Sequence, residues 1–127
     1  GPLGAMAIGA TAGFVCFFAT ILLKRVLQID DSLDVSPVHG VGGIVGVLLT
    51  GVFVDAALGG AGYAPGMTMG SQLLVQAIGV GATALWCGGV TWGILKLLDA
   101  TTGLRVDADA ESGGLDVAEH GETAYNG

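Results

Sequence analysis

The sequence predicts an all-α membrane protein with three transmembrane helices and a polar C-terminal tail. Only 12% of its 127 residues are charged and its mean hydropathy is +0.75, whereas a soluble domain carries about 25% charged residues. The charges cluster and leave long uncharged runs at residues 1–23, 35–54 and 56–95. A helix needs about 20 apolar residues to cross a bilayer, so the third run holds a loop and one helix. We expect a membrane domain over residues 1–98 and a tail over residues 99–127.

The first predicted span covers about residues 4–23 and ends at Lys24. The long side chain of a lysine can reach from a helix end into the interfacial region. Small residues recur every four positions at Ala5, Gly9 and Gly13, a spacing that lets helix backbones approach closely in lipid. This span is therefore predicted to pack within a helical bundle.

The second predicted span covers about residues 35–54 and carries a single ionisable side chain, His39. We expect Asp34 to hold the start of this helix, because acidic residues there favour the helix dipole and can cap free N–H groups. Pro37 fits an early helical position. A lone imidazole in such a run must be partnered or neutral. It is either a structural histidine bonded to nearby backbone or a functional group, the default for ionisable residues at membrane depth.

The third predicted span covers about residues 72–95 and follows a loop over residues 55–71 that has no Lys or Arg. With three spans, the cations all fall on the other side of the membrane: Lys24, Arg25, Lys96 and Arg105. The positive-inside rule then places the turn of residues 24–34 and the tail in the cytoplasm. We expect a multi-pass protein of the cell membrane, inner or plasma.

Several function classes have no support in the sequence. No nucleophile–base pair, phosphate-binding loop or metal-ligand spacing occurs, so we expect neither an enzyme nor a bound cofactor or metal. Cys16 and Cys87 lie within apolar runs and are typical of small buried hydrophobic residues. The net charge is −7, and seven of the eleven acidic residues lie from Asp99 onward. No basic patch indicates nucleic acid as a partner.

Several segments, taken in order, resemble the ammonium transporter (Amt/Mep/Rh) family. They are Asp30–Val35, Val38–Gly46, Leu49–Phe53, Gly103–Val106 and Gly114–Tyr125. The resemblance covers essentially the whole chain. Family members have more transmembrane helices than three, so the resemblance implies a fragment of a polytopic bundle, namely the last three helices and the cytoplasmic tail.

The resemblance implies a role for His39 as the second of two pore histidines whose imidazoles touch along a narrow hydrophobic channel. Ammonium would lose its proton, cross as ammonia, and pass the proton separately through the histidine pair. Val35 lies one turn before His39 on the same helical face and would line the pore. The family commonly has Phe-Gly where this chain has Ser36 and Pro37, so the start of this helix is expected to differ. The first pore histidine belongs to an earlier helix.

The resemblance also implies a homotrimer and contact of the tail with a P-II signalling protein. Within the tail, we expect residues 107–113 to be flexible and Gly114–Tyr125 to order by docking on a surface. Two alternatives stay open. The scaffold could be an ammonium sensor that signals through its tail, or the isolated chain could be inactive, because one wall cannot enclose a pore.

Overall fold

The computed structural model describes residues 1–123, and every regular element in that range is helical. Three helices are long and apolar enough to cross a membrane: Pro2–Val26, Ser36–Phe53 and Met69–Thr101. This confirms the all-α class and the three predicted spans. The chain divides into two compact units, one ending at Ala84 and the other beginning at Leu85.

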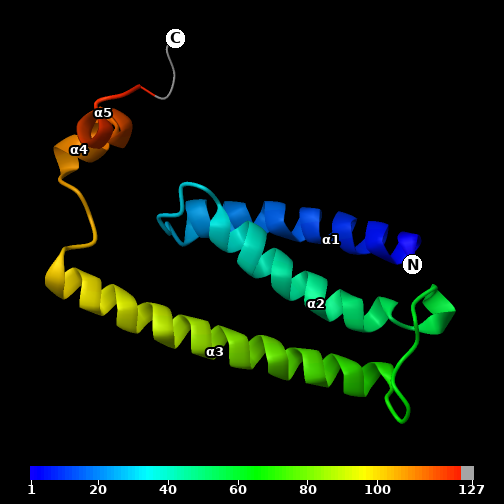
Figure 1. The fold of residues 1–127 in the computed structure, drawn as a ribbon. Coiled ribbons are helices and arrows are strands. Elements are labelled where there is room, and N and C mark those ends of the chain that lie inside the picture. Colours follow the sequence, from blue (N-terminus) through cyan, green and yellow to red (C-terminus); the bar gives the residue numbers. More distant parts are fainter. Residues whose placement is uncertain (124–127) are drawn as a thin grey trace. The chain divides into compact units, whose positions relative to one another are not determined.

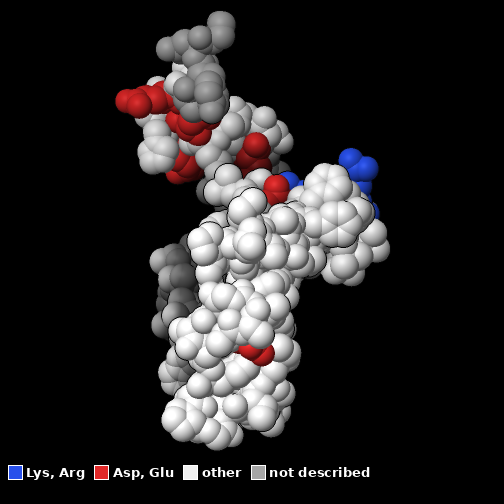
Figure 2. All heavy atoms as spheres, turned by 90° about the vertical axis from the view of Figure 1, so that its right-hand side faces the viewer, with Lys and Arg blue, Asp and Glu red and all other residues white. Residues whose placement is uncertain are grey.

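In the first unit, α1 (Pro2–Ile21) runs antiparallel to α2 (Gly42–Phe53) and lies beside it (Figure 1). The two helices approach most closely where glycine leaves room. Gly4 is buried, and a Cβ added there would lie 3.2 Å from Phe53 Cβ. Figure 2 views these helices nearly end-on, from the right-hand side of Figure 1, and shows almost no charge on their surface in this view. Helices with such a surface are suited to lipid or to other apolar helices.

The first and second predicted spans each contain a π-helical segment next to the turn that joins them. The first span ends in η1 (Leu22–Val26), which carries Lys24 and Arg25. The second begins with η2 (Ser36–Val41), one residue from the expected start, and continues directly into α2. A π-helical turn accommodates one extra residue and redirects the side chains that follow it.

The loop after α2 returns to the end of that helix. Asp55 caps the short 3₁₀ helix η3 (Ala56–Leu58) by accepting the Ala57 N–H at 2.9 Å. The hydroxyl of Tyr63 donates to the carbonyl oxygen of Gly51 at 3.1 Å. Desolvation, with a contribution from Asp55, raises the pKa of the Tyr63 hydroxyl above its ordinary value.

Helix α3 (Met69–Thr101) begins three residues earlier than predicted. Thr68 and Ser71 cap its start reciprocally. The Thr68 N–H donates to Ser71 Oγ at 2.8 Å, and the Ser71 N–H donates to Thr68 Oγ1 at 3.3 Å, which is the geometry of a capping box. Close to this end, the side chain of Gln76 packs directly on Gly51.

In the second unit, α3 continues past Lys96 to Thr101, beyond the predicted end of the span. Two short helices follow, α4 (Ala108–Gly113) and α5 (Leu115–His120), and they pack on one another. Of residues 107–113, which were expected to be flexible, Ala108–Gly113 form α4. Arg105 and Glu111 form an ion pair of 2.8 Å that ties α4 to the preceding segment. Residues 124 and 125 of the segment expected to order lie outside the described residues.

Candidate functional site

The turn before the second span is fastened to the helix by Asp31. Its carboxylate oxygens accept the Ser36 N–H at 2.7 Å and the Val35 N–H at 3.0 Å. These bonds satisfy two of the N–H groups that a helix start leaves without a partner. The bond from Ser36 is the main cause that lowers the pKa of Asp31 below its usual value. The acidic turn thus supplies a capping carboxylate.

Asp34 lies directly before the helix. A capping side chain would accept a backbone N–H, but the Asp34 carboxylate pairs with a lysine instead. The carboxylate pairs with Lys24 Nζ at 2.8 Å, and the backbone oxygen accepts the Val38 N–H at 3.1 Å. Its φ of 55° is in the left-handed region, which Asp tolerates better than most residues. Asp34 therefore joins the helix start to the end of the first span, while Asp31 makes the side-chain cap.

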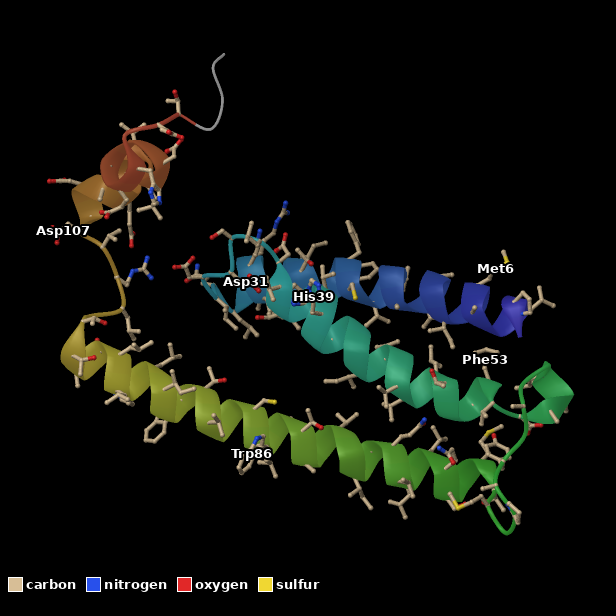
Figure 3. The ribbon with its side chains drawn as sticks, viewed as in Figure 1. Met6, Asp31, His39, Phe53, Trp86 and Asp107 are labelled. Carbon is tan, nitrogen blue, oxygen red and sulfur yellow. The ribbon has the colours of Figure 1, made fainter. Side chains whose placement is uncertain are left out.

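His39 lies in η2, about one helical turn after Ser36, and its ring is exposed. Figure 3 shows it toward the end of the helix pair that carries Asp31, whereas Met6 and Phe53 lie toward the opposite end. The ring makes no hydrogen bond or ion pair with any of residues 1–123. Within the described residues, the imidazole is therefore not bonded to neighbouring backbone.

The surroundings of His39 are apolar and open in this chain. Val35, on the preceding turn, is 50% exposed. A Cβ added at Gly40 or at Gly43 would meet no atom within 4 Å. The face that holds His39 and Val35 thus has free space around the imidazole among the described residues.

The helical hydrogen bonds are irregular around His39. The N–H of Gly42 donates to the carbonyls of Pro37 and His39, whereas in an α-helix it would donate to Val38. Pro37 is fully buried at this point. π-Helical segments occur frequently at functional sites. This irregularity could not be predicted from the sequence, because apolar spacing does not separate an α-helical turn from a π-helical one.

A groove of about 570 Å³ lies between α1 and the start of the second span, next to the turn that carries His39. Its lining is almost entirely apolar and consists of Ala12, Gly13, Cys16, Phe17, Thr20, Val38 and Gly42. Within the described part of the chain, no three His, Cys, Asp or Glu side chains are grouped to hold a metal ion. The chemistry that this region offers is therefore one exposed imidazole beside an apolar groove.

Comparison with known proteins gives a consistent result over the whole chain. Residues 1–125 match the model of the Ammonium Transporter Family. The chain is 45% identical to an ammonium transporter of Aquifex aeolicus over 126 residues, 98% of its length. It is 41% identical over 94% of its length to ammonium transporter 1 of Dictyostelium discoideum, and 41% identical over 96% to ammonium transporter Amt1 of Archaeoglobus fulgidus.

The chain is much shorter than these relatives. It covers 29% of the Aquifex protein, 26% of the Dictyostelium protein and 31% of the Archaeoglobus protein. The matched region is therefore less than a third of each relative, in agreement with a fragment of a larger helical bundle.

Proposed function

Because the chain belongs to the ammonium transporter family, we propose that it forms the C-terminal part of a channel that conducts ammonium as ammonia and a separate proton. The main observation behind this proposal is the position of His39 on the second span. His39 is the only ionisable side chain between Asp34 and Asp55, and it is exposed on an apolar span without a partner among residues 1–123. A second histidine, from a part of the bundle outside this chain, would complete the relay.

The physical reason for a histidine at this place is the cost of charge in an apolar pore. A bare cation is strongly disfavoured at membrane depth, whereas ammonia is neutral. An imidazole changes its charge in the physiological pH range and can accept a proton on one nitrogen while the other donates. His39 would therefore take part in moving the proton, and Val35, exposed one turn before it, would line the path of the neutral molecule.

We propose that the turn of residues 24–34 and the tail face the cytoplasm. Lys24 and Arg25 lie at the end of the first span, and Lys96 lies near the end of α3. The loop after α2 contains no Lys or Arg. This asymmetry supports the assignment, because cytoplasmic loops carry the excess of basic residues.

We propose further that three copies of the complete protein assemble and that the tail meets a P-II signalling protein. The tail segments that resemble the family support this. Within the second unit, Leu115 and Val117 of α5 are each 49% exposed, and such residues are suited to contact with another surface. Leu115→Asp should weaken capture of a purified P-II protein by the complete transporter, and unchanged capture would exclude α5 from the contact.

The channel role is tested in the complete transporter, reconstituted in liposomes. His39→Ala should reduce ammonium flux or alter its dependence on pH. His120→Ala is the matched control, since His120 lies at the end of α5 in the tail, and its flux should equal that of the unmodified protein. Unchanged flux and an unchanged pH profile for His39→Ala would remove His39 from the mechanism.

A further inference from the structure

Cys16 reaches from α1 to the backbone of the π-helical turn that carries His39. Its Sγ lies 3.8 Å from the carbonyl oxygen of Val38 and donates a weak hydrogen bond to it. This carbonyl is the one that the Gly42 N–H would take in a regular α-helix, and Gly42 donates to Pro37 and His39 in its place. The Cys16 thiol therefore donates to the Val38 carbonyl oxygen, which does not accept the Gly42 N–H in this irregular turn.

The fit of the thiol depends on a glycine. A Cβ added at Gly42 would lie 3.0 Å from Cys16 Sγ, closer than ordinary van der Waals contact. Cys16 is only partly exposed and lies in the groove between the two spans. A thiol from one helix thus occupies a space that the absent side chain of Gly42 leaves on the other.

We propose that Cys16 is a positioning residue for His39. The Val38 carbonyl and the backbone nitrogen of His39 belong to the same rigid peptide plane. A bond that holds the carbonyl therefore also restrains the backbone nitrogen of His39, and this narrows the directions in which the imidazole can leave the helix. This proposal rests on the proposed function of His39, and it assigns no chemical step to the thiol.

The test uses the complete transporter in liposomes, with ammonium flux measured as a function of pH. Cys16→Ala should lower flux about two- to tenfold, as expected for the loss of one weak hydrogen bond, and should shift the pH profile. Cys16→Ser keeps a donor of similar size and should restore most of the flux and the original profile. Gly42→Ala should resemble Cys16→Ala, because the added methyl displaces the thiol.

Two control variants separate this effect from general damage. Cys87→Ala removes the other cysteine, which is exposed on α3. Gly46→Ala adds a methyl one turn after Gly42, where nothing lies within 4 Å. Both should retain the flux and pH profile of the unmodified protein. Infrared spectra report the contact independently of transport. The S–H stretching band that is present in the unmodified protein and absent in Cys16→Ala should lie at the frequency of a hydrogen-bonded thiol.

The double variant Cys16→Ala with His39→Ala separates the two proposals. If Cys16 acts through His39, its substitution should add nothing once the imidazole is gone, a non-additive result. Additive losses, or a Cys16→Ala variant with normal flux and pH profile, would overturn the positioning role while the His39→Ala loss leaves the channel proposal intact. If His39→Ala itself has no effect, both proposals fail.

Discussion

The carboxylate of Asp31 accepts the Ser36 N–H at 2.7 Å, and this bond fastens the start of the second span to the turn before it. The same carboxylate accepts the Val35 N–H at 3.0 Å. Asp31→Ala should therefore lower the melting temperature of the complete protein in detergent more than Asp31→Asn, which keeps one acceptor oxygen. Equal melting temperatures for the unmodified protein and Asp31→Ala would show that the cap contributes nothing measurable.

The Asp31 cap should also depend on pH. The pKa of this carboxyl is lowered below its ordinary value of 3.8 in the folded protein, so the folded state favours the ionised form. Its stabilisation is fully present above the ordinary value and is lost as the pH falls through the lowered pKa. We therefore expect the difference in melting temperature between the unmodified protein and Asp31→Asn to shrink when the melting temperature is measured at decreasing pH, from neutral to acidic. A constant difference would contradict this assignment.

The Lys24–Asp34 ion pair should contribute little to stability. The two side chains are 40% and 32% exposed, and pairs of this kind are worth about 0–1 kcal/mol. Lys24→Met and Asp34→Asn should thus have small and similar effects on the free energy of unfolding. Asp34→Val should cost about 1–2 kcal/mol more, because a β-branched residue is strained at the φ of 55° found here. Equal effects of the Asn and Val variants would show that this backbone conformation is not maintained.

The close contact between Gly51 and Gln76 predicts a defined response to added volume. Gly51 is buried, and a Cβ there would overlap the Gln76 amide oxygen. Gly51→Ala should lower the free energy of unfolding by only about 1 kcal/mol, the low end of the usual cost of overpacking, because the amide that the added methyl meets is the far end of a flexible side chain. Adding Gln76→Ala should recover part of the loss, and Gly46→Ala, which meets nothing within 4 Å, is the matched control. No recovery in the double variant would show that the strain has another source.

The isolated chain of 127 residues should not conduct ammonium. Residues 1–123 contain no buried apolar core, and large side chains such as Leu3, Phe14 and Leu85 are more than half exposed. These faces need other helices to complete a packed bundle. Liposomes containing only this chain should therefore show the flux of empty liposomes. Flux above that level, sensitive to His39→Ala, would mean that the chain builds a pore by itself.

The sequence predicted that three spanning helices exist, but it predicted less well the residues at which they begin and end. Hydropathy identifies the part of a helix that suits lipid, so all three spans could be found, but it does not mark where a helix stops. This explains why α3 extends from Met69 to Thr101, beyond both predicted ends. The early start of α3 had a local signal in the Thr68–Ser71 capping pair, which sequence reasoning missed.

The site was predicted by residue type but not by geometry. His39 was found because it is the only ionisable group in its span. The sequence favoured Asp34 at the start of this helix, whereas the backbone path brings the carboxylate of Asp31 to the Val35 and Ser36 N–H groups. The contact between Cys16 and Val38 joins residues 22 positions apart through an irregular turn, and no sequence period encodes it.

The central claim is that His39 moves the proton that ammonium leaves behind. The most direct measurement follows ammonium uptake and proton movement together in liposomes that contain the complete transporter, with and without His39→Ala. We expect the ratio of protons to ammonium to change in the variant, because the proton loses its relay while the neutral molecule can still cross the pore. The same ratio and the same rate in both proteins would contradict it.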